Sequence, residues 1–371
     1  MPLRVLVTGG AGFIGQQLVR RLEADGHEVV VLDSFLPQVH GNVRPSLRCK
    51  TIWADIRDLD TLRGAMRDVN VVHHLAAETG VGQSQYEIAR YVSVNTHGTS
   101  LVLQAACEAD VRQVVIASSR AVYGEGRYRC PSCETLLPQM PRKPDDMAAG
   151  LYDILCPRCG TRAAVEPTPE DADLAPTSIY GITKLQQEQL ASTVATSHGL
   201  EVTLLRLFNV FGPGQSLRNP YVGVLGTFVR RMRDGQPVEL YEDGQMVRDF
   251  VFVSDVAEIF RNCTGNENAF GRTWNVGTGT PVTLHQLAQE LGAAIGTEPR
   301  VEVSGRFRLG DVRHAVADVA RLRQGLGEVP GTSLRQGLKE FVTWALENPD
   351  SAPDDLAEQQ LASRNLLRQT R

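Results

Sequence analysis

The chain is poor in lysine, although it is not poor in positive charge. Only four of its 38 lysine and arginine residues are lysine, at positions 50, 143, 184 and 339. Arginine is used wherever charge alone suffices, so each remaining lysine is a candidate for a specific chemical role. Lys184, which follows Tyr180 by four positions, is the first such candidate.

The chain also lacks a long apolar run and an excess of basic charge. No apolar segment approaches the roughly 20 residues that a membrane helix needs, and the formal net charge is −5 at pH 7. We therefore expect no membrane span and no binding to nucleic acid or to a membrane surface. The first residues lead directly into a strand-like run without a charged and apolar leader, so we expect a cytoplasmic protein.

Short apolar runs alternate with helix-like segments through the first half of the chain. This alternation predicts an α/β fold with a doubly wound parallel sheet of the Rossmann type. After residue 213 the pattern is less regular and predicts a smaller C-terminal substrate lobe. The expected division is a Rossmann domain at 1–124 and 174–208, an insert at 125–173, the second lobe at 209–348 and a polar tail at 349–371.

A glycine-rich turn follows the first predicted strand and opens the first predicted helix. Gly9, Gly12 and Gly15 permit a tight turn, and the helix N-terminus favours a diphosphate; a plain strand-to-helix turn is the alternative. Asp33 ends the second strand, where a carboxylate accepts hydrogen bonds from a ribose diol and disfavours NADP. An exposed turn is the alternative for Asp33 and equally for Asp55. We expect an NAD site formed by Gly9, Gly12, Phe13, Ile14, Gly15, Asp33, Asp55 and Ile56.

Tyr180 and Lys184 are four residues apart, so on a helix they share one face. A phenol ordinarily ionises near pH 10, and a nearby ammonium group favours the phenolate. Ser118 and Ser119 end a predicted strand, where a hydroxyl group can orient a substrate hydroxyl. The alternative is a solvated surface lysine, but the three residue types together indicate proton transfer at a substrate hydroxyl or carbonyl group.

Two Cys-x-x-Cys pairs lie in the insert, which otherwise lacks helical or strand periodicity. This spacing is typical of a zinc ribbon, and four thiolates leave no position for a water molecule. We therefore expect a structural Zn²⁺, with disulfides or free thiols as the alternatives. The expected ligands are Cys130, Cys133, Cys156 and Cys159.

In order, the motifs of the chain resemble those of the extended short-chain dehydrogenase/reductase family of NAD-dependent nucleotide-sugar epimerases and dehydratases. The matching segments are 9–15, 74–77, 95, 118–124, 180–184, 206–213, 248–251, 255–257, 275–277 and 310–311. The resemblance implies catalytic Ser119, Tyr180 and Lys184, a nucleotide-diphosphate sugar as substrate and, by analogy, a homodimer. It also implies further NAD contacts from Leu75, Ala76, Ala77, Asn95 and Ser118, and substrate contacts from Thr79, Asn209, Arg248, Arg308 and Asp311.

The reaction is expected to be a redox-neutral inversion at C4 of the sugar. Related 4,6-dehydratases carry two acids after the catalytic hydroxyl residue, whereas this chain has Arg120 and Ala121 there. Residues 74–84 and 118–126, with the cysteine-bearing insert, resemble the dTDP-L-rhamnose 4-epimerase group, and UDP-sugar 4-epimerases are the neighbouring possibility. A nucleotide-sugar 4-ketoreductase and a non-catalytic sugar-nucleotide or zinc-ribbon binding protein are the alternatives.

Overall fold

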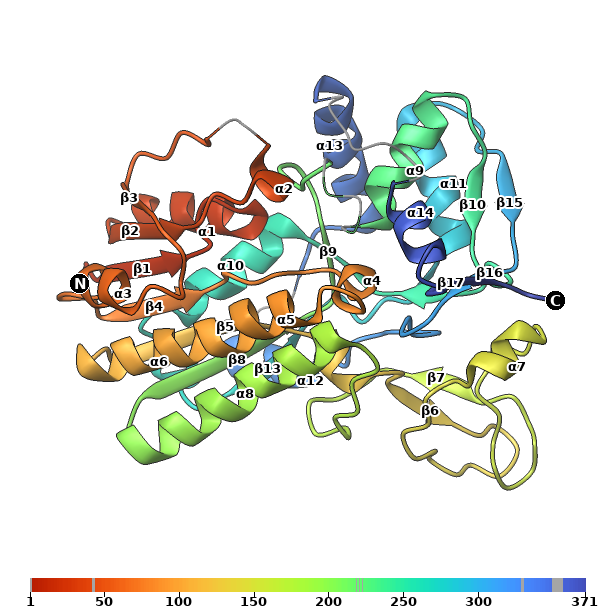
Figure 1. Cartoon of the computed structure of the whole chain (residues 1–371), viewed down its shortest axis with the longest axis horizontal. Helices are drawn as coiled ribbons and strands as arrows, with labels where there is room; N and C mark the ends of the chain where they lie inside the picture. The colour runs from red at the N-terminus through yellow and green to blue at the C-terminus, as the bar shows by residue number, and fades with distance from the viewer. Residues whose placement is uncertain are drawn as a thin grey trace.

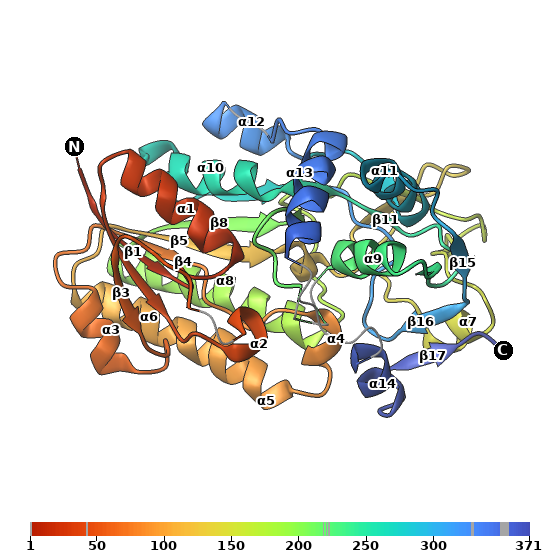
Figure 2. The same ribbon diagram turned by 90° about the horizontal axis from the view of Figure 1, so that it is seen from above.

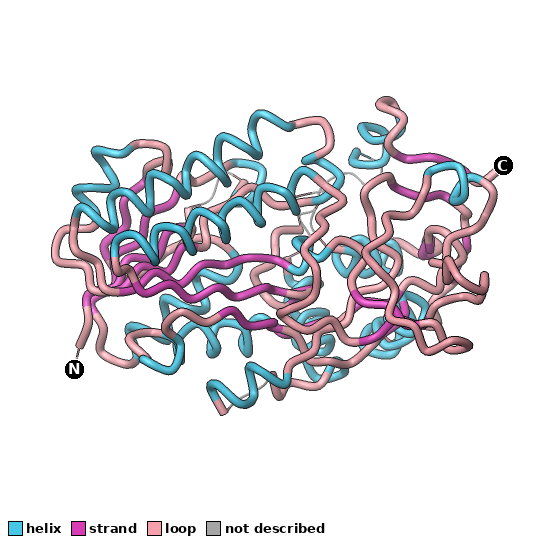
Figure 3. Tube along the Cα trace, turned by 90° about the horizontal axis from the view of Figure 1, so that it is seen from below, coloured by secondary structure: helices cyan, strands magenta, loops and turns pink. Residues whose placement is uncertain are grey.

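The computed structural model describes residues 2–41, 44–217, 219, 221, 223–327, 330–348 and 356–371. Its centre is a seven-stranded sheet in the order β13-β8-β5-β4-β1-β2-β3, in which all neighbouring strands are parallel. This confirms the predicted Rossmann-type fold class (Figure 3). The strands are β1 (Arg4–Thr8), β2 (Glu28–Asp33), β3 (Lys50–Trp53), β4 (Val71–His74), β5 (Gln113–Ser119), β8 (Glu201–Leu207) and β13 (Thr273–Val276).

Helices cover both faces of this sheet (Figure 2). Val5 and Val7 of β1 pack into one apolar core and Leu6 into the other, so alternate residues of a single strand are buried on opposite faces. Burial on both faces explains why the strands read as continuous apolar runs. One face carries α1 (Phe13–Ala24), α10 (Val253–Cys263) and α12 (Ala320–Leu326), and the other carries α3 (Leu59–Ala65), α6 (Gly98–Glu108) and α8 (Ile179–His198).

Several short elements frame the carboxyl edge of the sheet. The π-helix η1 (Val92–His97) leads directly into α6. The 3₁₀ turn η2 (Arg120–Tyr123) follows β5 directly. The short helices α2 (Pro37–His40), α4 (Val81–Ser84) and α5 (Ile88–Tyr91) complete this edge. A further 3₁₀ turn, η3 (Glu267–Ala269), lies at the opposite edge, where Glu267 pairs with Arg112 just before β5. None of the described helices is long and apolar enough to cross a membrane.

The second lobe has its own apolar core, built on α9 (Val224–Arg233), α11 (Leu284–Ile295) and α13 (Leu334–Glu347). Short strand pairs surround it: β9 (Asn209–Phe211) with β12 (Phe250–Phe252), β10 (Val238–Leu240) with β15 (Val301–Val303), and β11 (Val247–Arg248) with β14 (Val282–Thr283). The predicted range 209–348 is too simple, because it includes β13, an edge strand of the large sheet, and α10 and α12, which pack on that sheet.

The C-terminal residues are part of the second lobe and not only a polar tail. They form α14 (Leu356–Ala362) and β17 (Leu367–Gln369), which pairs with β16 (Arg306–Arg308). Leu361 and Leu367 are buried in the core of the lobe, and Figure 1 shows the C-terminus ending beside β16. The expectation of a polar tail at 349–371 is therefore wrong for residues 356–371, and residues 349–355 lie outside the described residues.

The insert is a separate small unit beside the second lobe (Figure 1). It contains β6 (Arg127–Arg129), paired antiparallel with β7 (Ala164–Glu166), and α7 (Pro144–Ala148). A chain of buried ion pairs joins it to the lobe: Arg142 contacts Glu125 and Glu242, each at 2.8 Å, and Arg313 contacts Glu242 at 2.9 Å.

Candidate active site

A cavity of about 730 Å³ lies at the carboxyl ends of β1, β2, β4 and β5, between the sheet and the second lobe. The strand order reverses between β1 and β4, which is where open α/β sheets bind ligands. Most of the residues predicted for the site line this cavity. They are Gly9, Gly12, Phe13, Ile14, Gly15, Asp33, Asp55, Ile56, Leu75, Ala76, Ala77, Thr79, Ser118, Ser119, Tyr180, Lys184 and Asn209.

The glycine-rich turn is closely packed at the start of α1. Gly9 has a φ of +70°, and a Cβ atom there would lie 2.7 Å from the Ala76 nitrogen. A Cβ atom at Gly15 would lie 2.3 Å from the Gly9 carbonyl oxygen, so both positions require glycine. Gly12 caps α1 and offers no side-chain acceptor to the first-turn N–H groups. These N–H groups and the helix dipole fit the diphosphate of a dinucleotide.

The carboxylate of Asp33 lies at the end of β2 and is fixed before any ligand binds. Oδ2 accepts a hydrogen bond from the Ala11 backbone N–H at 3.1 Å, and Oδ1 accepts one from Phe35 at 2.9 Å. His40, which the sequence did not suggest, has its Nε2 3.4 Å from Oδ1. A carboxylate held at this edge fits a ribose diol and repels a 2′-phosphate.

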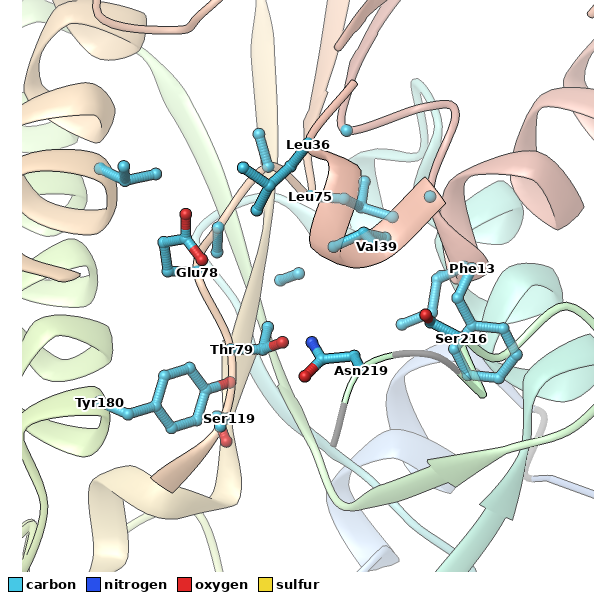
Figure 4. A pocket seen from close by; sticks show the side chains of 18 of the residues that line it. Phe13, Leu36, Val39, Leu75, Glu78, Thr79, Ser119, Tyr180, Ser216 and Asn219 are labelled. Carbon is cyan, nitrogen blue, oxygen red and sulfur yellow. The ribbon is translucent and has the colours of Figure 1, made fainter. Parts of the chain in front are cut away.

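The side chains of Tyr180 and Ser119 lie next to each other on one side of the cavity (Figure 4). Ser119 is the last residue of β5, and its Oγ accepts a hydrogen bond from the Ala121 backbone at 3.2 Å. Ser178 caps α8, accepting from the Gly181 N–H at 3.1 Å, and this places Tyr180 in the first turn. A Cβ atom at Gly181 would lie 2.6 Å from the Ala121 carbonyl oxygen, so glycine lets α8 approach η2.

The acidity of Tyr180 is set by groups from three elements. Burial raises its pKa, whereas the hydrogen bond with Ser119 and the positive charge of Arg120 lower it. Lys184 lies one turn along α8 and donates a hydrogen bond to the Ala117 carbonyl oxygen at 2.8 Å. Burial lowers the pKa of Lys184 to about 7. The Lys184 ammonium group donates to the β5 backbone and lies 6.0 Å from the centroid of the Tyr180 ring, so Lys184 and Arg120 both place positive charge near the phenol.

The side chains of two predicted NAD contacts, Asn95 and Ser118, are hydrogen-bonded to other protein groups. Asn95 is buried and does not line the cavity; its side-chain amide donates to the Glu78 carbonyl and to Thr183, each at 3.0 Å. Asn95 therefore ties the segment after β4 to α8. Ser118 lines the cavity, but its hydroxyl group donates to Glu188, which also pairs with Arg206.

Three of the predicted substrate contacts, together called the diphosphate clamp here, lie outside the described lining of the main cavity: Arg248, Arg308 and Asp311. Arg248 donates to the carbonyl oxygens of Val312 at 2.9 Å and Arg313 at 3.0 Å, which fixes its orientation. The Arg308 guanidinium group lies 4.7 Å from the centroid of the Tyr241 ring, and its buried Nε has no hydrogen-bond partner among the described residues.

Asp311 lines a second cavity of about 320 Å³, together with insert residues that include Arg142. The insert therefore borders this second cavity and contributes no residue to the described lining of the first. Thr79 and Asn209 do line the main cavity. The Thr79 carbonyl oxygen accepts from the Tyr91 hydroxyl at 2.6 Å, while the buried Oδ1 of Asn209 has no partner in the described ranges.

Sequence reasoning missed several charged residues of the cavity, namely Arg120, Glu78 and Arg90. Arg90 forms an ion pair with Glu78 at 2.8 Å, and both line the cavity near the segment after β4. Arg90 stands in no motif, and Glu78 was noted only as part of the segment 74–84, so their folded positions reveal this ion pair. Arg120 does stand in a motif, but it was read only as the absence of a carboxylate.

The four cysteines of the insert converge on one point. Their sulfur atoms all lie within 4.8 Å of one another, with Cys130 3.4 Å from Cys159 and Cys133 3.6 Å from Cys156. No disulfide joins them. Four sulfurs around a tetrahedral Zn²⁺ would be about 3.8 Å apart, given Zn–S bonds of about 2.3 Å. The donor set therefore fits a metal ion.

Comparison with known proteins gives consistent matches over most of the chain. A model described as "NAD dependent epimerase/dehydratase family" matches residues 5–145 and 158–277. The chain is 36% identical to a dTDP-L-rhamnose 4-epimerase of Burkholderia thailandensis over 358 residues, covering 94% of this chain and 96% of the relative.

Solved structures also match this chain over nearly its whole length. MoeE5 in complex with UDP-glucuronic acid and NAD is similar at a TM-score of 0.75 and 31% identity, covering 93% of this chain and 99% of that chain. The UDP-glucose 4-epimerase of Thermotoga maritima, solved with UDP-glucose, is similar at a TM-score of 0.75 and 29% identity, covering 94% of this chain and 100% of that chain.

Proposed function

The chain belongs to the NAD-dependent epimerase/dehydratase family, and from this premise we propose that it is a nucleotide-sugar 4-epimerase that uses NAD. The proposal rests on one observation: Ser119 and Tyr180 lie next to each other in the same cavity as the glycine-rich turn. The substrate is a dTDP- or UDP-hexose, and the relative from Burkholderia thailandensis makes dTDP-L-rhamnose the first to test.

Bound NAD would supply the hydride acceptor and donor for C4 of the sugar, and Lys184, which lines the same cavity, would hold the ribose next to the nicotinamide. The residues of the chain position the sugar and move one proton. Ser119 donates a hydrogen bond to the C4 oxygen, and Tyr180 as phenolate takes the proton from that oxygen. Tyr180 later returns the same proton to the oxygen of inverted C4.

The positions and pairing of the carboxylates in the cavity argue against a dehydration reaction. Among the described residues that line it, the carboxylates are Asp33, Asp55 and Glu78. Asp33 and Asp55 follow β2 and β3, away from Tyr180, and Glu78 is paired with Arg90. No acid of the lining is therefore available to remove a proton at C5 or protonate a leaving group at C6.

The test is a panel of nucleotide sugars that includes dTDP-L-rhamnose, with NMR analysis of the products, run once without added cofactor and once with added NADH. We expect a C4 epimer pair at equilibrium and no net change in NADH. Stoichiometric consumption of added NADH would instead identify a 4-ketoreductase, and a 4-keto-6-deoxy product would identify a dehydratase.

We also propose that Cys130, Cys133, Cys156 and Cys159 hold a structural Zn²⁺. The two knuckles have matching backbone hydrogen bonds, from Cys130 N to Thr135 O at 2.9 Å and from Cys156 N to Thr161 O at 2.8 Å. The insert has a very small apolar core, so a metal would supply most of its folding free energy.

A homodimer is the proposed assembly. The exposed apolar side chains of Ile88, Val92 and Ile182 lie on α5, η1 and α8, along the same side of the sheet as α6. Packing these helices against a second copy would bury all three. The mass of the protein in solution, measured by light scattering for the wild type and for Ile182→Glu, tests this assembly.

A further inference from the structure

Arg120 is a charged residue of the cavity that the proposed reaction has not yet used. It begins η2 directly after Ser119 and lines the same cavity as Tyr180. Within the described ranges, no hydrogen bond or ion pair engages its guanidinium group. An unpaired guanidinium group that is partly withdrawn from water is costly, so a ligand is the natural partner.

The groups around Arg120 do not neutralise it. Arg248 carries the same charge, and with burial it lowers the pKa of Arg120 to about 10. Glu125 faces Arg120, but both of its oxygens are already engaged, by Arg142 at 2.8 Å and by the Arg313 backbone at 2.7 Å. Asp311 also faces Arg120 but lies beyond ion-pair distance.

The local balance of charge is positive. Arg120 and Arg308 both lie near Asp311, and Arg248 lies near Arg120. The Asp311 carboxylate is not hydrogen-bonded by any residue in the described part of the chain. Arg248 is held by backbone carbonyl oxygens and by the Met246 sulfur, and none of the described carboxylates forms an ion pair with it. Three guanidinium groups against one carboxylate leave about two positive charges, which a diphosphate with about two negative charges would balance.

We propose that Arg120 is a substrate-binding residue whose guanidinium group binds a diphosphate oxygen of the nucleotide sugar. The proposal rests on the proposed function and refines it, because it extends the clamp from Arg248 and Arg308 in the second lobe to the edge of the Rossmann sheet. The diphosphate would then lie between the two lobes, with the hexose directed toward Ser119 and Tyr180. If Arg120 bound a neutral sugar hydroxyl instead, the excess positive charge of the three arginines would not be neutralised.

The experiment is calorimetry of dTDP and UDP with wild-type protein, Arg120→Gln and Arg120→Lys. Arg63→Gln is the matched control, because Arg63 lies on the surface of α3 and pairs with Glu108. We expect Arg120→Gln to raise the Kd for dTDP by about tenfold or more, since a charge-assisted hydrogen bond is lost. Arg120→Lys should give an intermediate Kd, and NAD binding should stay unchanged in all variants.

Two results would overturn the inference. One is an equal Kd for dTDP in wild type and Arg120→Gln. The other, with UDP-glucuronic acid titrated as a third ligand, is a loss of affinity for that ligand alone, which would mean that Arg120 binds a carboxylate on the sugar. Arg120→Lys keeps the test decisive if the glutamine variant fails to retain NAD. Binding needs no turnover, so an absence of epimerisation with an intact Arg120 effect would refute only the proposed function.

Discussion

Replacing Lys184 with methionine should make the NAD-free protein more stable at neutral pH while it abolishes turnover. The Lys184 side chain is 3% exposed, and burial lowers its pKa from 10.5 to about 7. Each pH unit between these values corresponds to about 1.4 kcal/mol, so the charged lysine costs roughly 4 kcal/mol at pH 7. Methionine removes this cost but also the hydrogen bond to Ala117, which offsets about 1–3 kcal/mol. The net gain in the free energy of unfolding is therefore about 1–3 kcal/mol.

The pH dependence of that gain is the sharper readout. Because the pKa of Lys184 is lower in the folded state, the unfolded chain holds this proton between about pH 7 and 10.5 and the folded chain does not. The wild-type free energy of unfolding thus rises with pH in this window relative to Lys184→Met. The advantage of the variant should be about 2 kcal/mol smaller at pH 9 than at pH 7.

Urea unfolding of both proteins, stripped of NAD and followed by circular dichroism at pH 7, 8 and 9, measures this difference. Every other titrating group is shared by the two proteins, so its contribution cancels. A stability difference that stays constant from pH 7 to pH 9 would show that Lys184 is not charged at a cost in the folded protein, and the reasoning would fail.

Four further predictions concern separate parts of the molecule. Tyr180→Phe should lower turnover about 10²–10⁴-fold with an unchanged NAD content, and wild-type turnover would remove Tyr180 from the mechanism. Asp33→Asn should narrow the preference for NAD over NADP in calorimetry; tighter NADP binding by the wild type would contradict the site. Replacing Cys156 and Cys159 with serine should release zinc and expose the insert to proteolysis, whereas metal-free, fully active wild type would argue for a thiol-bearing loop. Leu361→Ala should lower the free energy of unfolding by about 2–5 kcal/mol, and an unchanged urea midpoint would mean that α14 does not stabilise the fold.

The sheet was predictable because its strands are short apolar runs buried on both faces. β13 was not placed in that sheet, since a four-residue strand carries no information about its partner, and its neighbour β8 ends at Leu207, far earlier in the chain. The docking of the C-terminal residues was missed for a similar reason. Leu361 and the adjacent pair Leu366 and Leu367 are the few large apolar residues in a polar stretch, and only the folded lobe supplies the surfaces that they cover.

Much of the candidate site was predictable because parallel strands end at one edge, which gathers Gly9, Asp33 and Ser119 in space. The direction of each side chain was not predictable. Asn95 and Lys184 occupy motif positions, yet Asn95 donates a hydrogen bond to the Glu78 carbonyl oxygen and Lys184 donates one to the β5 backbone. Such directions depend on which neighbouring acceptors the packing leaves open, and a sequence pattern does not specify them.

The pairing of β17 with β16 bears on the order in which the protein can be made. Leu367 pairs with Arg308, and the backbone N–H of Arg371 donates to the Ala148 carbonyl oxygen of the insert at 2.9 Å. Residues 367–371 thus join two segments that are synthesised well before them. During synthesis the strands of the Rossmann sheet up to β8 can pair early, but the second lobe and the insert cannot complete their contacts until these late residues have been made.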